Sequence, residues 1–165
     1  LVYSVDDSFT TRFFSLLNLL PVFPLYYDGK TKFSPIHVTD LADIIFNIIY
    51  KNIDEKIVEC VGPDVLTFKE IITILLKSLN KKRLIVNMPL PIARLVAKTI
   101  ETTMSNPVFT QDQLKLLKYD NIASGIYKTN FDLNLEANLK FENEIKKYSY
   151  MWKETGQFSK KILNR

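Results

Sequence analysis

The sequence predicts an α/β fold, because short apolar, β-branched segments alternate with segments of helical periodicity along most of the chain. A second observation is the junction at Thr39, where a short strand-like segment passes directly into a strongly apolar helix. Junctions of this kind are where open α/β sheets place their ligand crevice. Only 38 residues precede Thr39, which is too few for the βαβ units that normally come before such a junction. We therefore expect this chain to form the C-terminal portion of a larger α/β fold.

The first part of the chain predicts alternating strands and helices. The polar residues at 6–8 can cap the first helix, and apolar side chains recur after them at helical spacing. Pro21 and Pro24 interrupt the next segment and Asp28-Gly29 marks a turn, so this segment is expected to be a loop. The helix that follows has apolar residues on nearly all sides, and we expect most of its faces to be covered. In order, the expected elements are a strand at 1–5, a helix at 8–20, a loop at 21–32, a strand at 35–38 and a helix at 40–52.

The second part of the chain continues this alternation, more weakly toward its C-terminal end. Thr67 and Glu70 have the spacing of a capping box, and Thr110 and Gln113 repeat that spacing. The helix after Thr67 has an apolar stripe at helical spacing, which consists of Phe68, Ile71, Ile72, Leu75, Leu76 and Leu79. Pro91 is well placed for the first turn of a helix. The expected elements are a strand at 56–61, a helix at 68–79, a strand at 83–88, a helix at 91–104, a short helix ending at 118 and a helix at about 135–150.

Composition and charge are those of an ordinary globular protein. The chain is 47% apolar and 24% charged, and its net charge of +4 is spread widely. The basic cluster at 81–83 lacks the interleaved aromatic residues of nucleic-acid-binding proteins, so we expect no nucleic-acid partner. The uncharged run 13–27 is short and broken by prolines, which limits membrane association to a peripheral contact at most. Residues 1–150 are expected to form one domain and residues 151–165 a polar tail.

Glycine spacing excludes the usual nucleotide-binding turns from this sequence. The chain holds four glycines, Gly29, Gly62, Gly125 and Gly156, and no two of them lie within the span of one motif. A dinucleotide-binding turn needs closely spaced glycines, because a Cβ atom would block the approach of the pyrophosphate. The glycine-rich phosphate cradle and the P-loop are therefore both absent.

Candidate catalytic and metal-binding residues are few. Tyr26 and Lys30 have the Tyr-x-x-x-Lys spacing of an acid/base pair, but they span a turn in which they would not share a helical face. His37 is the single histidine, so histidine-based metal sites lack ligands. It hydrogen-bonds a ligand, acts as a base or, as we favour, has a structural role. Asp40 is expected to stabilise the start of its helix and Cys60 to be a buried packing thiol; we expect no catalytic residue and no metal site.

One run of residues carries a specific resemblance to a known family. It places an aromatic residue, Ile-His-Val and Asp-Leu-Ala just before a long helix, and consists of Phe33, Pro35, Ile36, His37, Val38, Asp40, Leu41 and Ala42. This run resembles the motif near the C-terminal end of the extended and atypical short-chain dehydrogenase/reductases, which are nucleotide-sugar epimerase-like proteins. It is more similar still to the accessory dehydrogenase-like subunit of respiratory complex I, alpha-subcomplex subunit nine, and its bacterial relatives. Further matching residues are Val2, Tyr3, Asp7, Phe9, Phe13, Pro21, Pro24, Gly29, Lys30, Thr31, Lys32, Gly62, Pro63, Thr67, Phe68, Glu70, Thr110, Asp112, Gln113, Leu117, Asp120 and Asn121.

The resemblance implies a Rossmann-derived fold whose first strands and glycine fingerprint would lie before Leu1. NADP or NAD is the cofactor of the family, and Tyr3, Ser4 and His37 are the residues that would border it here. Ser4 and Val5 stand where the family usually has glycine and proline. We therefore do not expect this chain alone to bind the cofactor.

The resemblance also implies a function. It favours a non-catalytic, truncated NAD(P)-binding-fold protein with a structural or assembly role in respiratory complex I. Its partners would be complex I subunits or its own N-terminal half. It would reside in the bacterial cytoplasm, at the periphery of the inner membrane, or in the mitochondrial matrix. The alternatives are the C-terminal piece of an active NAD(P)-dependent short-chain reductase or nucleotide-sugar epimerase, and a decayed gene product.

The expected truncation has a structural consequence. The strand at 1–5 and the helix at 8–20 would lack the elements that normally pack against them. We therefore expect both to expose an unusual amount of apolar surface.

Overall fold

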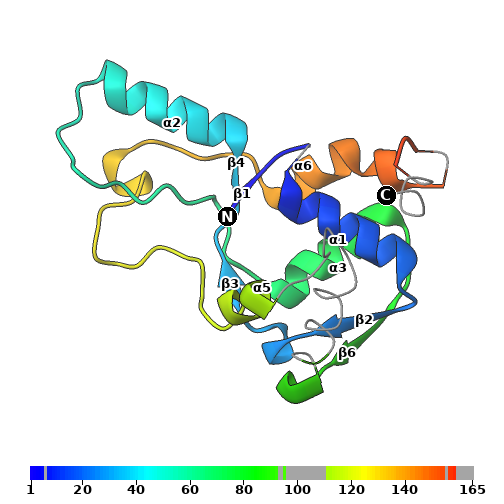
Figure 1. Cartoon of the computed structure of the whole chain (residues 1–165). Helices are drawn as coiled ribbons and strands as arrows, with labels where there is room; N and C mark the ends of the chain where they lie inside the picture. Colours follow the sequence, from blue (N-terminus) through cyan, green and yellow to red (C-terminus); the bar gives the residue numbers. More distant parts are fainter. Residues whose placement is uncertain (6, 93–94, 96–110, 155, 159–165) are drawn as a thin grey trace.

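The computed structural model describes residues 1–5, 7–92, 95, 111–154 and 156–158, and it shows a mixed α/β protein (Figure 1). Its elements are β1 (Val2–Tyr3), α1 (Ser8–Leu19), β2 (Val22–Leu25), η1 (Tyr27–Gly29), β3 (Lys32–Phe33), β4 (Ile36–His37), α2 (Val38–Tyr50), β5 (Leu66–Thr67), α3 (Phe68–Leu79), β6 (Leu84–Asn87), α5 (Gln111–Leu116), η2 (Phe131–Leu133), α6 (Phe141–Tyr148) and η3 (Ser149–Trp152). Strand β1 pairs with β4 and β2 with β6, both in parallel, whereas β3 and β5 are antiparallel. The predicted α/β class is confirmed, and the short parallel pairs with their helices are consistent with part of a Rossmann-like fold.

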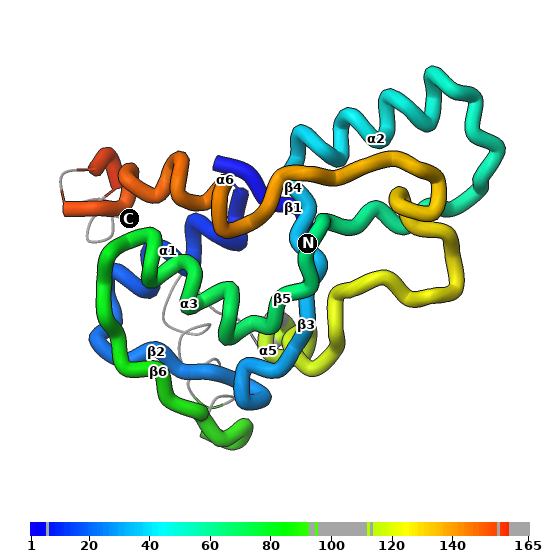
Figure 2. The backbone as a smooth tube through the Cα atoms, turned by 180° about the vertical axis from the view of Figure 1, so that it is seen from behind, coloured from blue at the N-terminus to red at the C-terminus, as the bar shows by residue number. Residues whose placement is uncertain are grey.

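Most of the buried apolar side chains lie in one cluster, which we call the main body. The main body consists of α1, α3, α6, η3 and the β2–β6 pair. Helix α3 contacts α1, α6 and η3, and both views place α1 and α3 next to the β2–β6 pair (Figures 1 and 2). The predicted stripe of α3 is buried as expected: Phe68, Ile71, Ile72, Leu75, Leu76 and Leu79 are all at most 6% exposed.

A second, smaller cluster lies outside the main body, in a part of the molecule that we call the α2 lobe. The α2 lobe consists of α2 and the segments 51–65 and 122–140, which extend away from the main body in both views (Figures 1 and 2). Among the described residues, four buried apolar side chains form its core, Ile36, Ile44, Leu135 and Ala137. Cys60 packs against this core, where burial raises the pKa of its thiol, so its predicted packing role is confirmed.

Side-chain caps explain where the helices begin. The capping box at α3 is confirmed, since the Glu70 amide donates to the Thr67 hydroxyl at 3.2 Å and the Thr67 amide donates to the Glu70 carboxylate at 2.7 Å. Of the candidates at 6–8, Asp7 caps α1, because its carboxylate accepts from the Thr10 amide at 2.6 Å. Each cap satisfies a helix N-terminal amide that has no partner within its own helix.

The predicted loop at 21–32 is wrong in its first part, where the chain forms β2. The four residues of β2 pair in parallel with β6, which was itself predicted as a strand. Pro24 lies inside β2 although it cannot donate a backbone hydrogen bond. In the described residues β2 has one partner strand, so the nitrogen of Pro24 can face the unpaired edge without breaking the ladder.

The predicted strand at 56–61 is also wrong. Glu59 forms an isolated bridge with Thr129, and no named strand covers this segment in the described part of the chain. The Glu59 amide donates to the Lys128 carbonyl at 2.9 Å, and the Asn130 amide donates to the Glu59 carbonyl at 3.2 Å. A β-branched sequence alone does not make a strand, because a ladder also needs a neighbour that stays in register.

The C-terminal part differs from the expectation at both of its ends. Helix α6 begins at Phe141 and not near 135, because Leu135 and Ala137 are drawn into the α2 lobe core. Trp152 is 1% exposed and stacks on Phe14 with a centroid distance of 4.8 Å. The start of the segment expected to be a tail is therefore packed into the main body.

Apolar exposure is distributed differently from the prediction. Val2 and Leu19 are exposed, but Tyr3, Phe14 and Leu17 are fully buried, so α1 is well covered on one face. The helix expected to be covered on most faces, α2, buries only Asp40 and Ile44.

Most of the helix predicted at 91–104, and the capping residue Thr110, lie outside the described residues. The short helix predicted to follow them is present as α5.

Candidate functional site

The β1–β4 pair forms the edge at which the resemblance placed the cofactor. Tyr3 and His37 are the last residues of these parallel strands and are partners in register. Helix α1 starts shortly after β1, and α2 starts directly after β4. The carboxyl ends of both strands and the N-termini of both helices thus lie at one edge, which is where α/β proteins bind their ligands.

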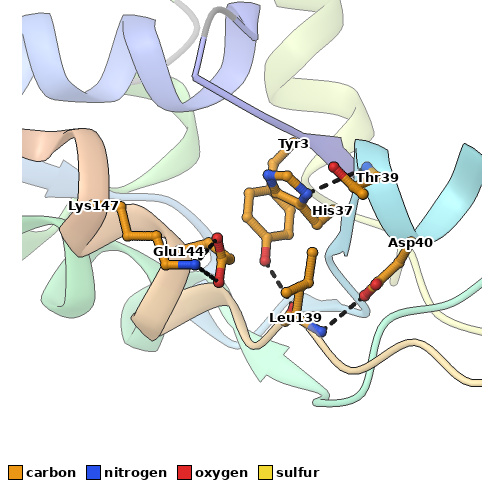
Figure 3. A network of polar contacts seen from close by, with 7 residues as sticks. All are labelled: Tyr3, His37, Thr39, Asp40, Leu139, Glu144 and Lys147. Carbon is orange, nitrogen blue, oxygen red and sulfur yellow. Dashed lines mark hydrogen bonds and ion pairs between the residues drawn. The ribbon is translucent and has the colours of Figure 1, made fainter.

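Tyr3 is buried completely, and its hydroxyl is used within the protein. The hydroxyl donates to the Leu139 carbonyl at 3.0 Å, and the ring packs edge-on against His37 (Figure 3). The ring of Phe141 also packs edge-on against Tyr3. Burial, followed by the charge of the nearby Glu144 carboxylate, raises the pKa of Tyr3 far above its usual range. The raised pKa and the hydrogen bond to Leu139 both keep the Tyr3 hydroxyl as a donor to the backbone.

His37 lies at the N-cap position of α2. Its Nδ1 accepts from the Thr39 amide at 3.3 Å and caps α2 (Figure 3). The ring also lies against Tyr3, with a centroid distance of 5.2 Å.

Asp40 does more than the helix-dipole interaction expected of it. It is 8% exposed, and its Oδ2 accepts from the Leu139 amide at 2.8 Å (Figure 3). Both polar groups of Leu139 are therefore held, the amide by Asp40 and the carbonyl by Tyr3. We call this arrangement the Leu139 clamp. It ties the segment before α6 to the end of β1 and to the first turn of α2.

Ser4 takes part in local capping. Its amide donates to Asp7 Oδ2 at 3.2 Å, which closes the turn between β1 and α1. Nearby, Gly62 passes so close to the strand that an added Cβ would lie 1.7 Å from the Pro35 carbonyl oxygen. Only glycine fits at this close approach. Position 62 therefore needs glycine because two backbone segments pack closely there, and not because a phosphate is bound.

The Tyr26–Lys30 pair is not arranged for acid/base chemistry. Tyr26 is buried, which raises its pKa to about 12. Lys30 instead pairs with Asp28 at 3.4 Å on the surface. Tyr27 and Asp28 between them have positive φ angles, so the segment is a kinked turn and not a continuous helix.

Across the described residues, no group of three or more histidine, cysteine or acidic side chains could hold a metal ion.

A pocket that the sequence analysis missed lies beside α1. It has a volume of about 380 Å³ and lies between α1 and residues 116–121. Phe9, Arg12, Phe13 and Leu16 line it from α1. Their spacing, with one arginine on an otherwise apolar helix face, is the signal in the sequence that could have indicated this pocket. We call it the α1 pocket.

The fold and the β1–β4 edge define a mixed α/β protein with part of a Rossmann-like topology. Comparison with known proteins finds a relative in the mitochondrial NADH-ubiquinone oxidoreductase 40 kDa subunit of Neurospora crassa. The two are 25% identical over 108 residues, which is 65% of this chain but only 29% of the relative. No family model matches the chain. Among the described residues, no helix has the length and apolar character needed to cross a membrane.

Proposed function

We propose that this chain is a non-catalytic structural component that binds subunits of respiratory complex I, or the remaining part of a Rossmann-like domain, through α2. The observation that carries this proposal is the exposed apolar face of α2. The weak similarity to a subunit of NADH-ubiquinone oxidoreductase supports the choice of complex I. The engagement of Tyr3, Asp40 and His37 in internal hydrogen bonds supports a structural role.

The exposed face of α2 is continuous along the helix. We call it the α2 outer face; it consists of Val38, Ala42, Ile45, Phe46, Ile49 and Tyr50. Ile49 is 72% exposed and Phe46 is 62% exposed, and the rings of Phe46 and Tyr50 stack with centroids 5.7 Å apart. A contiguous apolar face of this kind marks an interaction site.

The charges of α2 favour a protein partner over a lipid surface. Asp40 and Asp43 are the only charged residues within the helix, and Asp40 is buried. Helices that lie on membranes usually carry lysine or arginine along their polar face, and α2 has neither. A protein interface with an apolar centre fits this face better.

Substitution of the α2 outer face tests the proposal in the source organism. The full chain carrying both Phe46→Glu and Ile49→Glu is compared with the unchanged chain by blue-native electrophoresis of membrane extracts and immunoblotting. We expect the unchanged chain to migrate with a large complex and the double variant to lose this association. Ile126→Glu, at an apolar residue that is 78% exposed outside α2, is the matched control and should leave it intact.

Two results of this experiment would contradict the proposal. One is an unchanged chain that migrates only as a free protein near 19.2 kDa. The other is a double variant that remains in the complex although circular dichroism shows it to be folded. If the chain associates with the complex, we expect subcellular fractionation to recover it at the inner membrane or in the mitochondrial matrix.

We also propose that the chain by itself does not hold NADP or NAD. The reason is chemical: the closely spaced glycines needed to approach a pyrophosphate are absent from the sequence. Calorimetric titration of the full chain with NADPH should show no binding. Micromolar binding would favour the alternative, in which the chain is part of an active NAD(P)-dependent short-chain reductase or epimerase.

A further inference from the structure

We propose that the α1 pocket binds an amphipathic carboxylate, with its acyl chain against α1 and its head group at Arg12. This site goes beyond the interface proposed for α2, since it shares no residue with the α2 outer face. The proposal rests on the volume of the pocket, on its apolar lining and on Arg12, which has no ion pair among the described residues.

The wall formed by α1 is apolar and only partly covered. Phe9, Phe13 and Leu16 pack against the main body core, yet each remains half-buried and lines the α1 pocket. The rings of Phe9 and Phe13 meet edge-on with centroids 4.8 Å apart. Leu117 and Phe33, both buried, close the opposite wall. An apolar chain placed here would cover the part of these side chains that the protein itself leaves open.

Arg12 supplies a charge to this apolar wall. It lies three residues after Phe9 and four before Leu16, so all three are on the same helix face. Among the described residues, Arg12 forms no ion pair or hydrogen bond. The guanidinium group pairs well with a carboxylate, to which it can donate two parallel hydrogen bonds.

Two other polar side chains of the pocket, Asp120 and Asn121, already have partners. Asp120 accepts from the Lys32 amide at 2.8 Å, and Asn121 Oδ1 accepts from the nitrogen of Leu1 at 2.6 Å. Asp120 is thus oriented toward the backbone of β3 and is less suited to bind a cationic head group. Lys118, over the ring of Tyr119, adds a second positive charge near the wall. An anionic head group therefore fits this site better than a cationic one.

The volume of the pocket sets the size of the ligand. At about 380 Å³ the pocket lies near the lower end of the range of about 300–1,000 Å³ for small-molecule sites. This suits a single acyl chain of medium length and is too small for a dinucleotide together with a substrate. Dodecanoate is a probe of this class that stays monomeric at the concentrations needed.

The proposal is tested on the full chain by comparing two ligands that differ in one group, and by comparing substituted chains with the unchanged one. Dodecanoate and dodecan-1-ol differ only in the head group, and their binding is compared by calorimetry, with the site located by amide chemical shifts. We expect dodecanoate to bind more tightly than the alcohol, with shifts at Phe9, Leu16 and Leu117. Arg12→Gln should weaken the carboxylate about tenfold and leave the alcohol unchanged.

Two further variants distinguish binding in the α1 pocket from attraction of the carboxylate to surface charge in general. Leu116 lines the pocket and is 70% exposed, so Leu116→Asp should fold normally while repelling dodecanoate. Lys69→Gln removes an exposed charge away from the pocket and should have no effect. No binding of dodecanoate, equal binding of the alcohol, an unchanged affinity in Arg12→Gln, or shifts confined to α2 would each overturn the proposal. None of these outcomes bears on the association with complex I subunits.

Discussion

The main body and the α2 lobe contain similarly apolar helices, but they bury them to very different degrees. In the main body, α3 buries seven residues against α1, α6 and η3. In the α2 lobe, α2 is one residue longer and buries only Asp40 and Ile44. The difference lies in the neighbours: α3 is surrounded by helices, whereas α2 is backed by the irregular segments 51–65 and 122–140. Apolar content sets how much a helix can bury, and the surrounding elements decide how much it does bury.

The comparison predicts that the largest single losses of stability occur in the main body, including its C-terminal end. Trp152→Ala should lower the free energy of unfolding by about 3–5 kcal/mol, because it removes a large buried ring stacked on Phe14. Urea denaturation followed by circular dichroism measures this loss. Tyr150→Ala is the matched control, since Tyr150 is 59% exposed two residues away. Equal, small losses in both variants would show that this segment does not belong to the main body.

A smaller loss is expected within the α2 lobe, where Asp40 of α2 holds the segment that leads to α6. Asp40→Ala leaves the partly buried Leu139 amide without its acceptor and should lower the free energy of unfolding by about 1–3 kcal/mol. Asp43→Ala changes an exposed acid on the same helix and should have an effect within about 0.5 kcal/mol. Hydrogen exchange adds a local measurement, in which the Leu139 amide should exchange faster in Asp40→Ala. Protection that survives the substitution would mean that the Asp40 hydrogen bond does not hold this segment of the α2 lobe in place.

The smallest effect is expected at the cap of α3. Hydrogen bonds from the backbone and then the side chain of Thr67 lower the pKa of Glu70 in the folded protein. A lowered folded-state pKa means that this cap stabilises the protein above the pKa of glutamate in the unfolded chain, and that the stabilisation is lost as the pH falls through the folded-state value. Because Glu70 is exposed to solvent, its charge contributes only about 0.5 kcal/mol.

Thermal unfolding between neutral pH and pH 3 measures this contribution. Glu70→Gln keeps a neutral acceptor for Thr67, so the variant should lack the part of the acid-induced loss that belongs to Glu70. Glu136→Gln, at an exposed acid outside the helices, serves as the control. A Glu70→Gln profile that parallels the unchanged chain at every pH would show that burial of the α3 stripe alone stabilises this helix.

Local signals predicted the helices of the main body well. The Thr67–Glu70 capping box and the stripe of α3 are both present as predicted, because a cap and a helical stripe depend on residues three or four positions apart. The Asp28-Gly29 turn is also present, with positive φ at both residues. Caps, helical stripes and turns are formed by residues within a single element, so they can be predicted without knowing the fold.

Pairings between distant residues could not be predicted in this way. Strand β2 forms in a proline-containing segment because β6 lies beside it, sixty or so residues later in the chain. The Leu139 clamp joins residues separated by 99 and 136 positions, and a lone leucine carries no signal for it. Of the residues expected to border a cofactor, Tyr3 and His37 meet at one edge as the motif implied, while their hydrogen bonds could be seen only in the structure.

By itself, the sequence determined the α/β class, the caps and apolar stripe of α3, and the absence of a glycine-rich phosphate cradle. Each of these follows from the identity of residues that are close together in the chain. The tertiary structure decided that Trp152 is core, that α2 keeps an exposed apolar face, and that Tyr3 and Asp40 hold a backbone segment. Burial and long-range hydrogen bonding depend on which surfaces meet, and the meeting of surfaces is a property of the whole fold.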